Sequence, residues 1–178
     1  MKKVGIQLPR QANPEAVEIR YSLELEALSP IAEIIEVDAS TPEEFAEGVK
    51  DMDALITSWG FRIDAELISK LNKCVVIGVG SVGVDMVDIE AATAAGIVVT
   101  NVPDVFIEEV ADHAMMMLLA AGRRMKLMNR MAAEGNWWHG RPILSEVPRL
   151  YGQTLGLLAF GNVSRCMARR AKAFGMNI

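Results

Sequence analysis

Short apolar runs alternate with amphipathic stretches through the first hundred residues, and this alternation limits the possible fold more than any other feature of the chain. The apolar runs have strand length, the stretches between them have helical spacing, and the connections are short. Strands that alternate with helices are typical of a parallel sheet covered on both faces. We predict strands over residues 3–8, 31–37, 54–56, 74–78 and 97–100, and helices over 14–28, 64–71 and 88–95.

A further helix is predicted to begin near residue 40, where the start signals are strong. Thr41 offers a hydroxyl cap, Pro42 suits the first turn, and Glu43 and Glu44 place acids near the positive end of the helix dipole.

The composition narrows the classes of protein to which the chain can belong. With 178 residues, 51% of them hydrophobic, the chain is long enough for a core and is not a disordered polymer. Its net charge of −5 argues against nucleic acid as a general partner. We see no targeting signal, no uninterrupted apolar stretch of transmembrane length and no metal-ligand pattern. We therefore expect a cytoplasmic protein, not bound to membrane or metal, with Cys74 and Cys166 as free buried thiols.

Two loops follow neighbouring predicted strands and are candidates for a ligand site. Ligands of parallel sheets bind beyond the carboxyl ends of the strands. Thr57, Ser58, Trp59 and Gly60 follow the third predicted strand, and residues 80–83 follow the fourth. For Trp59 itself, an aromatic ring packed over a loop is the simpler interpretation.

Residues 78–83 match the pattern G-x-G-x-x-G in full, but five further residues precede the next helix. Because the dinucleotide motif requires a helix directly after it, we do not assign the motif here. Two interpretations remain open. The loop presents backbone N–H groups to a small anion such as a carboxylate, or its glycines only permit a tight turn.

The middle of the chain is predicted to form one long helix over residues 108–134, rich in methionine. Such a helix suits a core or subunit contact and a crossing between two domains. Trp137 and Trp138 are predicted to lie in the loop after it, as a buried anchor or a partner surface. We expect His113 to be a packed residue and His139 a surface residue, neither of them catalytic.

The last stretch, residues 152–178, has the pattern of a strand over 154–160, a turn at Gly161, a helix over 163–174 and the beginning of a second strand. This order is that of the first β-turn-α of a nucleotide-binding unit, in which a pyrophosphate binds at the helix N-terminus. Ala159 and Ser164 replace the first and last glycines of the fingerprint, so a plain strand-turn-helix remains an alternative. The helix also carries a basic side, interpreted as a solvated face or as a phosphate contact: Arg165, Arg169, Arg170 and Lys172.

Residues 81–124, SVGVDMVDIEAATAAGIVVTNVPDVFIEEVADHAMMMLLAAGRR, resemble the D-isomer-specific 2-hydroxyacid dehydrogenases, and residues 152–178 are similar to the start of their nucleotide-binding domain. The resemblance implies an α/β fold: a flavodoxin-like parallel-sheet substrate domain over residues 1–102, then a long linking helix and the first β-α of a Rossmann domain. Residues 103–178 would therefore form the linking helix and an incomplete nucleotide-binding domain.

The resemblance also implies roles for particular residues. Ser81, Val82 and Gly83 match a G-V-G loop whose N–H groups hold the substrate carboxylate, with serine in place of the first glycine. Val110 belongs to a V-A-D step near the nicotinamide, and Ile107 stands where many members have threonine. The implied substrate-binding residues are Ser58, Trp59, Gly60, Ser81, Val82 and Gly83, and the implied cofactor-binding residues are Val110, Gly161, Asn162 and Val163.

As a function, the resemblance implies hydride transfer between NAD or NADP and a small 2-keto or 2-hydroxy acid in the complete protein. The family's catalytic arginine, glutamate and histidine would fall after Ile178, so we assign no catalytic residue and predict that this 178-residue chain is inactive. The alternative is a non-catalytic interaction protein of the same fold, like the carboxy-terminal-binding co-repressors. We also predict a homo-oligomer, because apolar residues 155–158 and the methionine-rich helix lack their normal cover.

Overall fold

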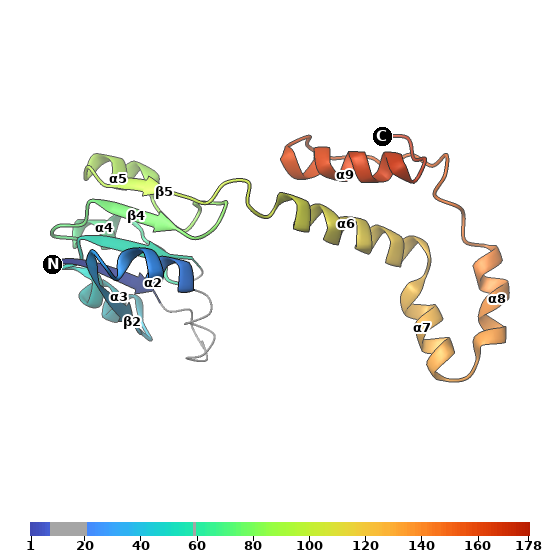
Figure 1. The fold of residues 1–178 in the computed structure, drawn as a ribbon, viewed down its shortest axis with the longest axis horizontal. Helices are drawn as coiled ribbons and strands as arrows, with labels where there is room; N and C mark the ends of the chain where they lie inside the picture. Colours follow the sequence, from blue (N-terminus) through green and yellow to red (C-terminus); the bar gives the residue numbers. More distant parts are fainter. Residues whose placement is uncertain (8–20, 59) are drawn as a thin grey trace. The chain divides into compact units, whose positions relative to one another are not determined.

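The computed structural model describes residues 1–7, 21–58 and 60–178, and the chain divides into two compact units, Met1–Pro103 and Asp104–Ile178 (Figure 1). We refer to them as unit 1 and unit 2.

Unit 1 contains a parallel sheet with the strand order β2-β1-β3-β4-β5. This order is that of the flavodoxin-like doubly wound folds, so the predicted fold class is confirmed. Paired residues such as Thr57 and Val79 bring the carboxyl ends of β3 and β4 to the same level. The strands are β1 (Lys2–Gln7), β2 (Ala32–Val37), β3 (Ala54–Thr57), β4 (Val76–Val79) and β5 (Val98–Thr100).

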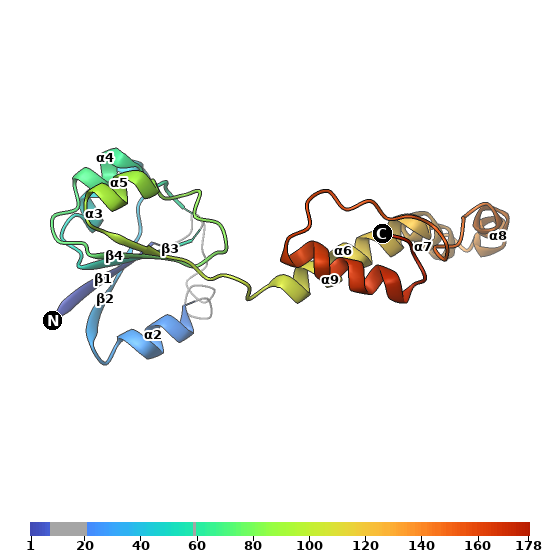
Figure 2. The same cartoon turned by 90° about the horizontal axis from the view of Figure 1, so that it is seen from above.

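Helices cover both faces of this sheet. Figure 2 shows α3, α4 and α5 on one face and α2 on the other. Part of the first predicted helix, residues 14–20, lies outside the described residues. The helices of unit 1 are α2 (Ser22–Leu28), α3 (Pro42–Val49), α4 (Ala65–Ser69) and α5 (Ile89–Ala94).

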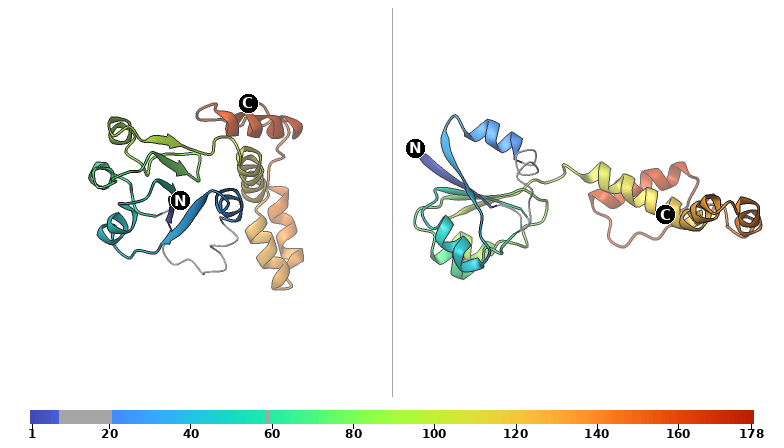
Figure 3. Two further views of the ribbon diagram at one scale, coloured as in Figure 1. Left: turned by 60° about the vertical axis from the view of Figure 1, so that its left-hand side comes forward. Right: turned by 90° about the horizontal axis from the view of Figure 1, so that it is seen from below.

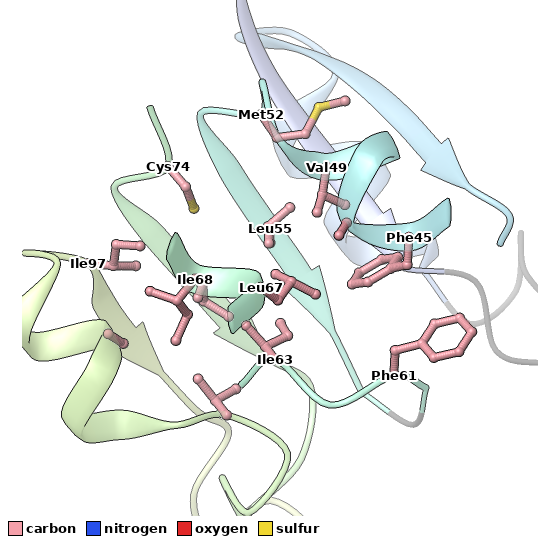
Figure 4. Packing of buried hydrophobic residues seen from close by; sticks show 14 of the residues in the cluster. Phe45, Val49, Met52, Leu55, Phe61, Ile63, Leu67, Ile68, Cys74 and Ile97 are labelled. Carbon is pink, nitrogen blue, oxygen red and sulfur yellow. The ribbon is translucent and has the colours of Figure 1, made fainter. Parts of the chain in front are cut away.

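The main core lies between the sheet and α3–α5 (Figure 4). Phe45, Ile63 and Ile77 are fully buried in it, and the rings of Phe45 and Phe61 stack with their centroids 5.7 Å apart. Burying one such side chain contributes about 1.5–3 kcal/mol to folding.

Side chains cap three of the helices in unit 1. Thr41 accepts a hydrogen bond from the Glu44 N–H at the start of α3, as predicted. Asp64 and Asp88 do the same for α4 and α5, with N···O distances of 2.9 Å. The caps satisfy helix N–H groups that have no partner within the helix.

Unit 2 is helical, and Figure 3 shows α7 and α8 running back along each other. The prediction of one helix over residues 108–134 is wrong, because the chain breaks at Arg124, which has a left-handed φ of 52°. The apolar periodicity continues across the break, so spacing alone could not reveal it. The helices are α6 (Ile107–Gly122), α7 (Met125–Ala133), α8 (Trp137–Ser145) and α9 (Asn162–Ala173).

The tryptophan pair and His113 also differ from expectation. Trp137 and Trp138 begin α8 instead of lying in a loop, and Trp138 is 70% exposed with the Arg141 guanidinium 5.3 Å from its ring centroid. The expectation that the tryptophan pair is a buried anchor is therefore wrong. His113 is exposed on α6, so the expectation that it is packed is also wrong, whereas His139 is exposed as expected.

The chain's last stretch keeps the predicted order, but its strands are shorter than predicted. Where a strand over residues 154–160 is expected, the structure has a parallel bridge between Thr154 and Asn177. Ala159 adopts a left-handed φ of 65°, which ends any extended run before α9. In α9 itself, Met167 and Ala171 are buried, whereas Phe174, directly after the helix, is 45% exposed.

Candidate functional site

The loops after β3 and β4 lie side by side at the carboxyl edge of the sheet in unit 1. The Gly80 N–H donates to the Thr57 carbonyl oxygen at 2.7 Å, and a Cβ placed on Gly80 would lie 3.7 Å from the Cβ of Ser58. Ser58 is buried, and Gly60 is half-buried. Trp59 lies outside the described residues. The structure thus brings the two predicted substrate loops together.

All three carbonyl oxygens of the Ser81, Val82 and Gly83 loop accept hydrogen bonds. They receive the Val102 N–H at 3.1 Å, the Asn101 side-chain amide at 2.8 Å and the Ser81 hydroxyl at 2.8 Å, respectively. Within the part of the chain that the structure describes, the N–H groups of the same three residues have no acceptor. A loop with occupied carbonyls and free N–H groups is suited to an anion.

A negative charge stands beside this loop. A Cβ on Gly83 would lie 2.9 Å from the exposed Asp85 carboxylate. Because like charges repel, Asp85 would oppose a bound carboxylate and weaken its binding.

Sequence reasoning missed Gln7, the last residue of β1. Gln7 is 3% exposed and lies against Thr57 and Gly60, at the base of the first loop. A glutamine directly after the apolar segment of residues 4–6 was the only signal that could have pointed to it.

The second candidate site is the N-terminus of α9. Its N-cap, Gly161, is extended and makes no side-chain cap, and a Cβ there would meet no atom of the described residues within 4 Å. The N–H groups of the first turn are therefore left without a side-chain cap, which suits a phosphate. Asn162 and Val163 follow directly, whereas Val110 lies half-exposed in the first turn of α6.

Helices α6 and α9 run in parallel, side by side in Figures 1 and 2, and polar side chains join them like the rungs of a ladder. The rungs are spaced four residues apart along both segments; Asp104 lies just before α6 and the other members lie on α6 and α9, so one face of each helix meets the other. The rungs pair Asp104 with Asn162 at 2.8 Å, Glu108 with Cys166 at 3.3 Å and Asp112 with Arg170 at 2.6 Å.

This ladder engages two of the four basic residues on α9. Arg169 and Arg170 form ion pairs with Glu108 at 2.9 and 2.7 Å, so neither is simply a solvated charge or a free phosphate contact. Arg165 lies nearer the helix start, where its Nε donates to the Phe160 carbonyl oxygen at 3.2 Å.

The ladder also changes the acidity of its members. Hydrogen bonds from Arg170, and then from Cys166, hold the pKa of Glu108 below its ordinary value. The same carboxylate, together with Asp112, raises the pKa of Arg170. Both shifts favour the charged forms that hold α9 on α6.

Several other groups bear on the chemistry of the chain. Among the described residues, no cluster of His, Cys, Asp and Glu side chains is placed to hold a metal ion. In that same part of the chain, no helix combines the length and apolar character needed to span a bilayer. Both cysteines are free, and burial raises the pKa of the Cys74 thiol.

The fold is that of an α/β protein with a flavodoxin-like sheet, and both candidate sites present backbone N–H groups: the loop after β4 and the start of α9. The family pattern described as "D-isomer specific 2-hydroxyacid dehydrogenase, catalytic domain" matches residues 16–175. The chain belongs to this family, whose members use NAD or NADP.

Named relatives agree with this assignment. The chain is 39% identical to a glyoxylate reductase of Pyrococcus furiosus, over 82% of this chain and 45% of that protein. It is 38% identical to a D-3-phosphoglycerate dehydrogenase of Methanocaldococcus jannaschii, over 86% of this chain and 29% of that one. The crystal structure of the TT0316 protein of Thermus thermophilus matches with a TM-score of 0.76 and 34% identity, over 98% of this chain and 54% of that one. The chain thus spans about half the length of these relatives or less.

Proposed function

We propose that the chain supplies the substrate domain, residues 1–102, and the linking helix and first part of the cofactor domain, residues 103–178, of an NAD(P)-dependent 2-hydroxyacid dehydrogenase. The complete protein would transfer hydride between the nicotinamide and a small 2-keto or 2-hydroxy acid. The observation that carries the proposal is the Ser81–Gly83 loop, whose carbonyls are occupied and whose N–H groups have no acceptor in the described residues.

Each candidate residue has a place in this proposal. The N–H groups of Ser81, Val82 and Gly83 bind the substrate carboxylate, and Ser58, Trp59 and Gly60 also belong to the substrate site. The uncapped start of α9 at Gly161, Asn162 and Val163 binds the cofactor phosphates, and Val110 lies toward the nicotinamide. The family membership and the names of the relatives support both roles.

We further propose that this chain by itself does not turn over substrate. The resemblance places the catalytic arginine, glutamate and histidine after Ile178, and without them the carbonyl has neither an orienting cation nor a proton donor. An assay of NADH and NADPH oxidation with glyoxylate tests this, and measurable turnover by the 178 residues would contradict it.

Binding can be tested separately from turnover. We would titrate the ¹⁵N-labelled chain with oxamate, an unreactive carboxylate analogue, and with ADP, a fragment of the cofactor. Oxamate should shift the amide signals of residues 81–83, and ADP those of residues 161–163. Signals that move elsewhere, or not at all, would refute the corresponding site. Asp85→Asn should strengthen oxamate binding by roughly threefold, since it removes an opposing charge.

A second candidate function is a non-catalytic interaction protein. The observation in its favour is an apolar groove of about 860 Å³ in unit 2, lined mainly by methionine, leucine, alanine and Phe174 side chains of α6, α7 and α9. This candidate predicts self-association or partner binding without any response to ADP or oxamate, which the same titrations distinguish.

We also propose that the chain forms a homo-oligomer in the cytoplasm. The groove and the exposed side chains of Met116, Met125 and Trp138 support a second copy as its occupant, because apolar surface of this extent favours association. The two free cysteines fit a reducing compartment. Light scattering over a wide concentration range tests the association, and a constant monomer mass would exclude it.

A further inference from the structure

Gln7 contacts both ends of the loop that follows β3. Its Oε1 accepts a hydrogen bond from the Thr57 hydroxyl, and its Nε2 donates to the Phe61 carbonyl oxygen at 3.5 Å. Thr57 and Phe61 are the residues directly before and after the Ser58–Trp59–Gly60 loop. One side-chain amide therefore joins the residues that stand before Ser58 and after Gly60.

Gly60 rests directly on the same amide. A Cβ added to Gly60 would lie 2.4 Å from both the Cδ and the Nε2 of Gln7, closer than real Cβ atoms approach. A side chain at position 60 would therefore have to displace the Gln7 amide from its hydrogen bonds with Thr57 and Phe61.

Thr57 extends these contacts to the second loop. Its hydroxyl faces Gln7, and its carbonyl oxygen accepts the Gly80 N–H at 2.7 Å. Gly80 directly precedes Ser81, Val82 and Gly83. A single residue thus connects the Gln7 amide with the start of the anion loop.

The cluster lies in a place where apolar side chains would ordinarily stand. Gln7 and Thr57 are 3% and 1% exposed at the ends of two parallel strands, and the Tyr21 hydroxyl donates to the Gln7 carbonyl oxygen at 3.1 Å. Strands buried on both faces are usually continuously apolar. Burying an amide and a hydroxyl here is tolerated because they satisfy each other, and the result is a defined geometry.

We propose that Gln7 and Thr57 are positioning residues that form a clamp on Ser58 and Gly60 and set them against the anion loop, and so determine how tightly the chain binds a small carboxylate. The clamp itself follows from the contacts in unit 1, whereas the identity of the ligand rests on the proposed function. Neither residue touches the ligand in this proposal.

The test compares two substitutions at one position. Thr57→Val keeps the shape of the side chain but removes the hydroxyl, and Thr57→Ser keeps the hydroxyl. Val49→Ala, at a buried core residue of α3 that is not part of the clamp, is the control for a general loss of stability. The readouts are hydrogen exchange at the Gly80 amide relative to the rest of the sheet, and the dissociation constant of oxamate.

For Thr57→Val we expect Gly80 exchange to rise by roughly tenfold relative to the sheet and oxamate binding to weaken by roughly five- to tenfold, because Gln7 loses its donor. For Thr57→Ser, both the Gly80 exchange rate and the dissociation constant of oxamate should stay within about twofold of the values for the parent chain. Val49→Ala should raise exchange across unit 1 without singling out Gly80, and should leave oxamate binding unchanged in the folded fraction.

Distinct outcomes separate the two proposals. If Thr57→Val behaves like Val49→Ala, the clamp is refuted. If Thr57→Val loosens Gly80 selectively but the parent chain does not bind oxamate, the clamp stands and the substrate assignment fails. Should Thr57→Val not fold, Gln7→Met removes the amide from the other side and is held to the same comparison with Val49→Ala.

Discussion

Units 1 and 2 are held together in different ways. In unit 1 a continuous apolar core lies under three helices whose first turns are capped by Thr41, Asp64 and Asp88. In unit 2, every residue of which the structure describes, none of the helices has a side-chain cap, and a polar ladder joins α6 to α9. Large apolar side chains such as Met125 and Trp138 stay exposed there.

This difference indicates how each unit meets its surroundings. In unit 1, side chains cap the first turns of three helices and a large apolar core is buried. The N–H groups of Ser81, Val82 and Gly83, which have no acceptor in the described residues, lie in a loop at the edge of its sheet. Unit 2 leaves N–H groups at α9 and an apolar groove without a partner among the described residues. We infer that unit 1 is stable by itself and that unit 2 gains stability from what binds it.

The largest expected effect is on the core of unit 1. Phe45→Ala should lower the free energy of unfolding of unit 1 by about 3–5 kcal/mol, because it leaves a cavity in a closely packed core. Phe174→Ala, the same change at a side chain 45% exposed in unit 2, should cost less than about 1 kcal/mol. Urea unfolding followed by the amide signals of each unit measures both. Equal losses of unfolding free energy in the two variants would show that the units do not differ in packing.

The next largest effect is on association through unit 2. Met125→Lys places a charge in the apolar groove and should weaken self-association by roughly tenfold or more, since the charge would have to be buried. Leu23→Lys, at an exposed apolar residue of unit 1, is the matched control and should leave self-association unchanged. Sedimentation equilibrium measures the association constant of each variant. A response to Leu23→Lys alone would place the interface in unit 1.

A third substitution gives α9 the cap that the helices of unit 1 have. Gly161→Asp should weaken ADP binding by roughly fivefold, because its carboxylate would occupy the first-turn N–H groups and repel phosphate. Gly161→Asn offers a neutral cap of the same size and should weaken binding less. Titration with ADP measures both. Unchanged affinity in Gly161→Asp would mean that phosphate does not bind at α9.

The smallest expected effect concerns the ladder. Glu108→Gln should raise hydrogen exchange in α9 by roughly two- to fivefold at neutral pH, the scale of an exposed ion pair. Glu109→Gln neutralises the adjacent carboxylate, for which no ion pair is found in the described residues, and serves as the control.

The pH dependence of this effect has a definite sign. The pKa of Glu108 is lowered in the folded chain. Its contribution to the stability of the folded chain is therefore fully present above the ordinary glutamate pKa of about 4.3, and is lost as the pH falls through the lower folded value. The difference between Glu108→Gln and the parent chain should therefore disappear in acid. A difference that persists at low pH would mean that the effect is not electrostatic.

The elements of unit 1 were predictable from local pattern. Each strand contains a short apolar segment, and the start of α3 at Thr41 follows from a cap and early acids within one turn. In unit 2 the same approach failed at Arg124, because apolar spacing continues across the break while the backbone turns left-handed. It failed again at Trp137, where an aromatic pair after glycine and asparagine resembles a loop but begins α8.

By itself, the sequence determined the strand and helix pattern of unit 1, the family, the glycine-containing loop of residues 78–83 and the turn at Gly161, because each is recorded in residues that are neighbours along the chain. Only the tertiary structure decided which distant residues meet. The clamp joins Gln7 to Thr57, 50 residues apart, and the ladder joins Asp104 to Asn162, 58 residues apart. Such contacts depend on the order of strands in a sheet and on the direction in which two helices pack, and no local periodicity records either.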